Sequence, residues 1–205
     1  MSKILGLYSA LNKSKQRFID EVFGSEIYRS CLPQLTIIDA GAYKGEFSFY
    51  ALNVAKIIYA FEPDPRPYRI LEQRVKNFKL GNIIKTFPMA LSGKTGERIF
   101  HASGYGGSRL LDKDDSEYPK EERIKVKTIS LVDFMDKFKI EQIDIFKIDV
   151  EQGENEIFNT PEFPELSRKI KCIIGEHLSG VHKILTSLDY KAKHVEGENT
   201  LYVKA

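Results

Sequence analysis

The sequence has few cysteines, no long hydrophobic run and almost no net charge. Its two cysteines, Cys31 and Cys172, lack the spacing of metal ligands and each neighbours a predicted strand, so we expect buried free thiols. No stretch approaches ~20 apolar residues, which argues against a membrane-spanning helix. The first residues lack the apolar region of a secretory signal, so a cytoplasmic protein is expected. A net charge of +2 does not favour nucleic acid or an anionic membrane as a partner.

Alternating strand and helix patterns across the 205 residues predict an α/β fold with a Rossmann-like, doubly wound, seven-stranded sheet. A continuous apolar run at 35–38 predicts a strand that is buried on both faces. Further strands are predicted at 56–61, 82–87, 143–148 and 170–175. Helical spacing predicts helices at 45–54, 65–78, 130–138, 153–158 and 181–188. Two further strands, 190–195 and 201–203, flank a turn signal and predict a terminal antiparallel β-hairpin. This hairpin would add two closing strands, one of them antiparallel.

Two segments fall outside this alternation. Residues 1–34 are a predicted N-terminal extension with an amphipathic helix over 13–29, and residues 94–128 are a predicted insertion. The insertion holds two predicted strands around the glycine-rich stretch Gly104–Gly107, which indicates a flap or a hairpin. Because there are no internal repeats or low-complexity tracts, we expect one domain over residues 1–205.

The first predicted strand ends in a glycine turn, Asp39-Ala-Gly41-Ala-Tyr-Lys-Gly45, that opens a helix. Amides at such a helix N-terminus suit a carboxylate or a phosphate. A dinucleotide fingerprint would need a third glycine between Gly41 and Gly45; without it a pyrophosphate would be crowded, whereas an amino-acid tail would not. The carboxylate of Asp39 would contact either a ligand ammonium or the amides of the turn. A plain strand-to-helix turn is the alternative.

Glu62 ends the second predicted strand, about twenty residues after Gly41. A carboxylate at this point accepts hydrogen bonds from both hydroxyls of an unphosphorylated ribose. The alternative is an acid that caps the next helix, but Asp64 is also placed to do so. The layout of Gly41 and Glu62 therefore favours an enzyme with a nucleoside-containing cofactor.

Charged residues also gather at the ends of the fourth and fifth predicted parallel strands. Lys147, Asp149 and Glu151 alternate along the fourth strand, so they share one face if the strand extends that far. Ligands of open α/β sheets bind beyond these ends, which makes the three side chains candidates for catalysis or substrate binding, with a Lys–carboxylate pair as the structural alternative. Glu176 and His177 end the fifth strand, where a histidine beside an acid is a further catalytic candidate. Asp149, Glu176 and His177 would also suit a divalent cation, but spacing in the sequence does not establish that they converge.

These segments resemble, in the same order along the chain, the motifs of the FkbM family of S-adenosylmethionine-dependent methyltransferases. The resemblance covers about residues 36–176 and is carried by six motifs: Asp39–Ser48, Phe61–Pro63, Ala90–Gly93, Gly106–Leu110, Ser130–Phe134 and Lys147–Glu151. The last of them, Lys-Ile-Asp-Val-Glu, is the most specific. The chain departs from the family pattern at Tyr43, where Asn is usual, at Gly93, where Asp is frequent, and at Gln152, where Gly is usual.

The resemblance implies a class I methyltransferase fold with S-adenosylmethionine as cofactor. In the first turn the implied cofactor contacts are Asp39, Gly41, Ala42, Tyr43, Gly45 and Ser48. After the second and third strands and in the insertion they are Glu62, Pro63, Asp64, Met89, Ala90, Leu91 and Ser108. Phe87, Met89 and Ala90 would form an apolar slot for adenine, and residues 104–110 would close over cofactor and acceptor.

The same resemblance implies O-methylation of a hydroxyl on a sugar or another small metabolite. Asp149, Glu151 and His177 are the candidate general bases, and Lys147 completes the implied catalytic group. The expected partner is a small-molecule or glycan acceptor, with no metal and no nucleic acid. The chain has no apparent second substrate domain. A partner subunit would then complete the pocket, so a homo-oligomer is compatible with the sequence.

Two other functions stay open at this point. A NAD-dependent oxidoreductase fits the spacing of Gly41 and Glu62, although the missing glycine and the closing hairpin speak against it. A catalytically silent module that binds S-adenosylmethionine fits the departures at Tyr43 and Gln152.

Overall fold

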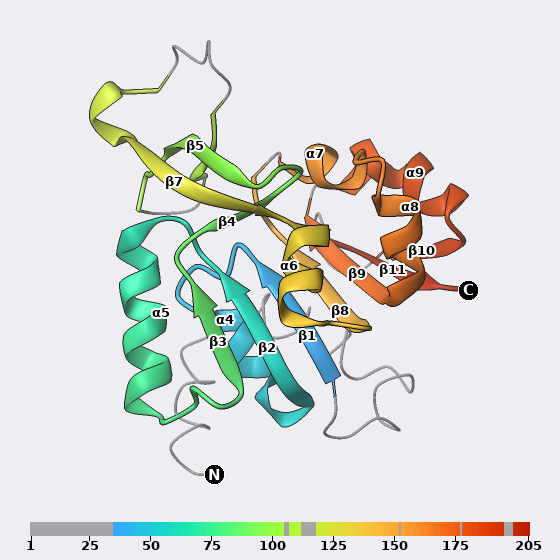
Figure 1. Ribbon diagram of the computed structural model, residues 1–205, viewed down its shortest axis with the longest axis horizontal. Coiled ribbons are helices and arrows are strands. Elements are labelled where there is room, and N and C mark those ends of the chain that lie inside the picture. Colours follow the sequence, from blue (N-terminus) through green and yellow to red (C-terminus); the bar gives the residue numbers. More distant parts are fainter. Residues whose placement is uncertain (1–34, 105–106, 112–117, 152, 177, 195–198) are drawn as a thin grey trace.

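The computed structural model describes residues 35–104, 107–111, 118–151, 153–176, 178–194 and 199–205 (Figure 1). Its strands are β1 (Leu35–Ala40), β2 (Ala55–Phe61), β3 (Ile84–Phe87), β4 (Ala90–Ser92), β5 (Gly96–His101), β6 (Arg109–Leu110), β7 (Arg123–Ser130), β8 (Ile143–Ile148), β9 (Ile170–Glu176), β10 (Tyr190–His194) and β11 (Asn199–Lys204). Its α-helices are α4 (Glu46–Tyr50), α5 (Pro65–Asn77), α6 (Leu131–Phe138), α7 (Glu154–Phe158), α8 (Phe163–Leu166) and α9 (His182–Ser187). The predicted helix over 13–29 and Cys31 lie outside the described residues.

Seven strands form one sheet in the order β10-β11-β9-β8-β1-β2-β3. Strands β3, β2, β1, β8 and β9 are parallel, whereas β11 runs antiparallel to both β9 and β10. This confirms the predicted doubly wound sheet, including the terminal hairpin and its antiparallel strand. The strand order switches between β1 and β8, and ligands of such sheets bind beyond the carboxyl ends at the switch point.

Both faces of this sheet are buried against helices. Neighbouring residues Ile37 and Ile38 of β1 are fully buried but belong to opposite cores. Ile38 packs in the core that includes Phe134 of α6, and Ile37 packs in the core that includes Leu71 of α5. Burial on both faces is the physical reason why β1 reads as a continuous apolar run in the sequence.

The insertion forms most of a second, four-stranded sheet in the order β4-β7-β5-β6. Strands β5 and β7 pair antiparallel, as the predicted hairpin requires, but β6 lies between them in the sequence and pairs with the other edge of β5. β7 continues to Ser130, beyond its predicted end at residue 128, and pairs in parallel with β4, which the sequence did not predict. Figure 1 shows this sheet above the carboxyl ends of β2 and β3 in that view. The insertion therefore covers the edge where ligands bind.

Several predicted boundaries shift by a few residues. The helix expected over 45–54 is split into the five-residue α4 and a 3₁₀ turn over Ala51–Asn53. The predicted cap at the start of α6 is confirmed, because the Ser130 side chain accepts a hydrogen bond from the Asp133 amide at 3.1 Å. Cys172 is buried and forms no disulfide with another described residue. In the part of the chain that the structure describes, no helix is long and apolar enough to span a bilayer.

Candidate active site

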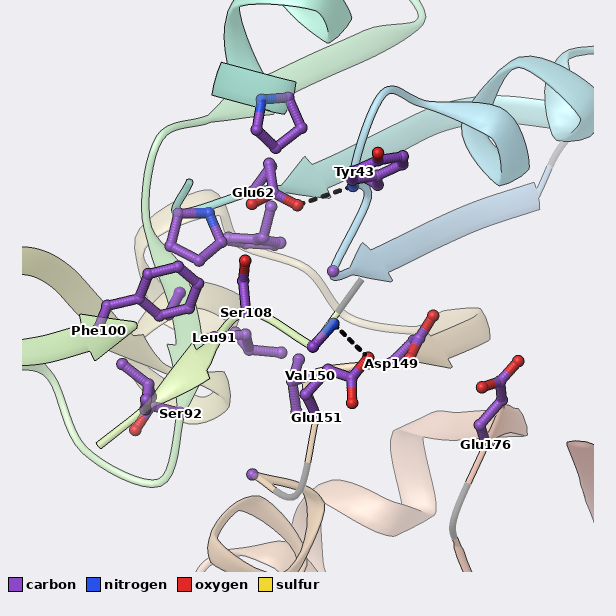
Figure 2. A pocket seen from close by; sticks show the side chains of 18 residues that line it. Tyr43, Glu62, Leu91, Ser92, Phe100, Ser108, Asp149, Val150, Glu151 and Glu176 are labelled. Atoms are coloured by element: carbon purple, nitrogen blue, oxygen red, sulfur yellow. Dashed lines mark hydrogen bonds between the residues drawn. The ribbon is translucent and has the colours of Figure 1, made fainter. Parts of the chain in front are cut away.

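A cavity of about 320 Å³ lies between the carboxyl ends of β1, β2, β8 and β9 and the strands β4–β6 of the second sheet (Figure 2). This volume falls at the lower end of the range of small-molecule sites, roughly 300–1,000 Å³. Four predicted cofactor residues line it from β1 and β2: Gly41, Tyr43, Glu62 and Pro63. Three line it from the second sheet and its loop: Ala90, Leu91 and Ser108. The predicted catalytic residues Asp149 and Glu151 line the remaining side.

The glycine turn after β1 depends on a close approach of two backbones. Gly41 has a φ of +78°, and a Cβ built on it would lie 1.8 Å from the carbonyl oxygen of Asp149. Gly45 also has a positive φ, +92°, but its Cβ would meet Leu71 of α5 at 2.7 Å. Gly45, which was expected to contact the cofactor, does not line the cavity, and its missing side chain makes room for a helix instead. Ala42, likewise, is buried in the core and does not line the cavity.

Glu62 is the buried acid of the cavity, only 6% exposed. One carboxylate oxygen accepts a hydrogen bond from the Tyr43 amide at 2.8 Å (Figure 2), and the other accepts one from the Asp64 amide at 2.7 Å. Burial raises the pKa of Glu62 to about 7, although the two amide hydrogen bonds act in the opposite direction. The carboxylate is thus held in place by two backbone amides, and its pKa lies near neutral pH.

Asp64 lies behind the cavity and holds two segments together. It caps α5 by accepting a hydrogen bond from the Arg66 amide at 2.9 Å, the role that the sequence allowed for it. It also accepts hydrogen bonds from the Gly104 amide at 2.9 Å and the Ser108 hydroxyl at 3.4 Å. Asp64 therefore fastens the insertion loop next to the cavity instead of lining the cavity itself.

We expect Asp64→Ala to lower the free energy of unfolding by about 2 kcal/mol, since it removes a helix cap and leaves the Gly104 amide without its acceptor. Asp64→Asn should lose less, because its side-chain oxygen still caps the helix. Urea unfolding of the three proteins measures both changes. A loss below about 0.5 kcal/mol for Asp64→Ala would contradict this role.

Asp39, Ser48 and Lys147 lie behind the cavity wall. Asp39 is fully buried; it accepts a hydrogen bond from the Ser48 hydroxyl at 2.6 Å and lies 3.3 Å from the Lys147 ammonium. Burial disfavours the charge on Lys147, but the carboxylates of Asp39 and Asp149 outweigh it and raise the pKa of Lys147. A lysine that stays protonated does not accept a proton, so the geometry gives Lys147 no role as a base.

The acidic side of the cavity is formed by Asp149, Glu151 and Glu176 (Figure 2). β8 ends at Ile148, so the alternation expected to carry Glu151 onto the face of Lys147 does not hold. Glu151 has a φ of +53° and accepts a hydrogen bond from the Gly107 amide at 3.1 Å. The predicted residue His177 lies outside the described residues, as does Gln152. Among the residues that the structure describes, no group of three acids, histidines or cysteines is arranged to hold a metal ion.

Some cavity residues carried no signal in the sequence. These are Phe100 of β5 and Pro67 in the first turn of α5, whereas Leu110 of β6 belongs to the segment 104–110 that was expected to cover the cofactor. Conversely, Phe87 and Met89 do not line the cavity, so the expected adenine slot keeps only its third member, Ala90. Phe87 instead stacks on Phe61 with ring centroids 5.1 Å apart.

Comparison with known proteins agrees with this architecture. The model of the methyltransferase FkbM domain matches residues 39–191. The methyltransferase FkbM from Methylobacillus flagellatus KT has a similar structure, with a TM-score of 0.56 and 16% identity over 86% of this chain and 46% of that one. The chain thus spans about half the length of that protein. No curated protein sequence matches the chain.

Two further solved structures share the fold at low identity. The METTL16 methyltransferase domain has a TM-score of 0.53 and 12% identity over 92% of this chain and 65% of that one. The putative methyltransferase yhhF from Escherichia coli has a TM-score of 0.51 and 12% identity over 92% and 86%. These likenesses show the class I methyltransferase fold, and the domain match shows the family. The chain belongs to the FkbM family of methyltransferases.

Proposed function

We propose that this protein transfers a methyl group from S-adenosylmethionine to a hydroxyl of a sugar or another small metabolite. The observation that carries the proposal is the position of Glu62 at the cavity end of β2. Each of its oxygens accepts one backbone amide, and a carboxylate oxygen has room for a second donor. Glu62 can therefore accept from both hydroxyls of a ribose without giving up the bonds that orient it.

The rest of the cavity fits the same cofactor. Pro67, Leu91 and Phe100 give it apolar surface suited to a purine, and the turn at Gly41 brings bare backbone to its wall. When bound, S-adenosylmethionine supplies a methyl group on a sulfonium. The attacking hydroxyl oxygen bonds to the methyl carbon while the carbon–sulfur bond breaks, and the electron pair of that bond returns to sulfur. The protein mainly positions the two reactants.

Asp149 is the side chain that we assign to the acceptor's proton. It lies at the end of β8, lines the cavity and has a side chain that is 36% exposed. A carboxylate there can accept the proton that the hydroxyl loses as it attacks. Glu151 is engaged with the Gly107 amide, and Lys147 is buried and protonated, so both are less suited to this role.

The charges around the cavity favour an acceptor without a phosphate. Asp149, Glu151 and Glu176 line its acidic side, and no lysine or arginine lines it among the described residues. An anionic acceptor would meet repulsion from these three carboxylates, because the ammonium of Lys147 lies behind Asp149 and does not line the cavity. We therefore infer that the reacting part of the acceptor is neutral or carries an amine.

Titration calorimetry tests the cofactor, and a charge-graded acceptor panel tests the reaction. We expect S-adenosylhomocysteine to bind and NAD not to bind; NAD binding alone would favour the oxidoreductase.

Glucose, glucosamine, glucuronic acid and glucose 6-phosphate then serve as acceptors with labelled S-adenosylmethionine. Transfer to the first two supports the proposal, and transfer to only the last two contradicts the charge argument. Cofactor binding with no transfer to these or to a wider set of hydroxyl compounds would favour the silent module.

The affinity for S-adenosylhomocysteine should depend on pH through Glu62. The pKa of Glu62 without ligand is raised to about 7, and donation by ribose hydroxyls favours its charged form. Affinity is therefore highest above pH 7 and falls by up to about tenfold per unit below it, with proton release on binding near pH 7.

Calorimetry between pH 5.5 and 8.5, in buffers of different ionisation enthalpy, measures both the affinity and the released proton. Glu62→Gln should weaken binding and flatten the profile, while Asp149→Asn should keep the profile of the wild-type protein. An affinity that does not change across this range would argue against Glu62 as the ribose ligand.

A further inference from the structure

Lys147 belongs to β8, one of the two strands that meet at the switch point of the sheet. In the register of β1 and β8, Lys147 pairs with Asp39. Its side chain is only 11% exposed, and it does not line the cavity. A lysine this deeply buried has lost most of its hydration, so the groups that replace water around its ammonium are informative.

On one side the ammonium contacts the cofactor turn. It donates a hydrogen bond to the carbonyl oxygen of Gly41 at 2.7 Å and to that of Ala40 at 3.3 Å, and it lies 3.3 Å from a carboxylate oxygen of Asp39. The Gly41 carbonyl belongs to the residue whose α-carbon packs against the backbone of Asp149. Lys147 therefore fixes the orientation of the peptide that forms the cavity wall.

On the other side the same ammonium lies 3.6 Å from a carboxylate oxygen of Asp149, which faces the cavity. The other charged groups near this point are carboxylates: Asp39 from β1, Glu62 at the end of β2, Glu151 after β8 and Glu176 at the end of β9. Among the residues that the structure describes here, Lys147 is the cation placed against Asp149. It is thus positioned to attract the Asp149 carboxylate toward the cofactor turn.

We propose that Lys147 is a positioning residue that couples the two halves of the site. Its ammonium holds the Gly41 carbonyl at the cofactor turn and the Asp149 carboxylate at the acceptor side in one fixed arrangement. Lys147 touches neither cofactor nor acceptor and acts through these two groups. The inference rests on the proposed function, because the proposed methyl transfer is what requires a fixed distance between cofactor and proton acceptor.

A purely structural ion pair of Lys147 with Asp39 would behave differently. Breaking a buried pair leaves an uncompensated charge and destabilises the protein, whereas neutralising both partners is often tolerated. If the pair served only the fold, Asp39→Asn/Lys147→Met would be as competent as Asp39→Asn alone. If Lys147 positions the site, the double variant folds but binds and reacts poorly.

The experiment compares the wild-type protein, Asp39→Asn, Asp39→Asn/Lys147→Met and a control, Lys171→Met. Lys171 is a more exposed lysine on β9 that pairs with Asp144 at 2.7 Å, away from the cavity. Thermal unfolding reports folding, calorimetry with S-adenosylhomocysteine reports the cofactor turn, and crystal structures report the positions of the Gly41 carbonyl and the Asp149 carboxylate. Turnover is measured with the panel acceptor that the wild-type protein methylates.

We expect the double variant to unfold cooperatively, to bind S-adenosylhomocysteine at least tenfold more weakly than Asp39→Asn, and to lose a further tenfold or more in kcat. Lys171→Met should match the wild type within twofold. Equal affinity and kcat in Asp39→Asn and the double variant would overturn the proposal, and so would a loss in only one of the two. If the double variant does not fold, the structure of Asp39→Asn decides: a displaced Lys147 with an unmoved Asp149 carboxylate overturns the coupling, and both groups in place support it.

The failure of this inference is distinguishable from that of the proposed function. A wild-type protein that binds no S-adenosylhomocysteine rejects the proposed function, and the inference with it. Normal binding and transfer by the wild type, with no separation between the single and double variants, rejects only the role of Lys147.

Discussion

Asp149→Asn is expected to lower kcat at least about a hundredfold while changing the affinity for S-adenosylhomocysteine less than threefold. The asparagine keeps the size and the hydrogen-bonding outline of the side chain but cannot take the proton of the acceptor. Cofactor affinity should be spared because the backbone of residue 149, which packs against Gly41, is unchanged. Steady-state kinetics with the accepted panel sugar, together with calorimetry, separates the two effects.

The matched control is Asp136→Asn, at an exposed position of α6. It should leave both kcat and affinity at the wild-type values. Wild-type turnover in Asp149→Asn would remove Asp149 as the proton acceptor, and Glu176, which lines the same side of the cavity, would be the next residue to test.

Gly41→Ala should damage both the fold and the cofactor site. The new Cβ would lie 1.8 Å from the carbonyl oxygen of Asp149, and the φ of +78° is unfavourable for alanine. The contact is with backbone, so no side-chain rotation relieves it, and β1 and β8 must move apart. We expect the free energy of unfolding to fall by about 2–4 kcal/mol. Binding of S-adenosylhomocysteine should weaken at least a hundredfold, because the displaced turn forms the cavity wall.

Urea unfolding and calorimetry measure these two losses. Gly81→Ala is the control, because nothing lies within 4 Å of a Cβ at that position and its φ is not in the left-handed region. It should change the free energy of unfolding by no more than about 0.5 kcal/mol. Gly41→Ala with the stability and affinity of the wild type would show that the turn tolerates a side chain and would contradict its assigned role.

The main sheet was predictable because its central strands are buried on both faces. That burial gives strongly apolar segments such as Ile143–Ile148, where the only charged residues are Asp144 and Lys147, and whose predicted and observed limits are the same. The second sheet was harder. β4 has three residues, too few to show a period, and it is a strand only because it pairs with β7, about forty residues later in the chain. Pairing over such distances leaves no local signal.

The location of the site was predictable, but which of its residues line the cavity and which lie behind its wall was not. Strand ends and turns placed Gly41, Glu62 and Asp149 at one edge of the sheet, and all three line the cavity. The alternation of charged residues along β8 also placed Lys147 at this edge. It does not reveal that the Lys147 ammonium lies behind the cavity wall, 3.3 Å from Asp39. Leu91 of the apolar wall was predicted, but Phe100 was not, because its position depends on how β5 packs.

The most direct test of the account is a crystal structure of the protein with S-adenosylhomocysteine. We predict the adenosyl group in the cavity between β1, β2 and the second sheet, with both ribose hydroxyls within hydrogen-bonding distance of the Glu62 carboxylate. A cavity that stays empty at saturating ligand, or a ligand bound away from Glu62, would contradict the account.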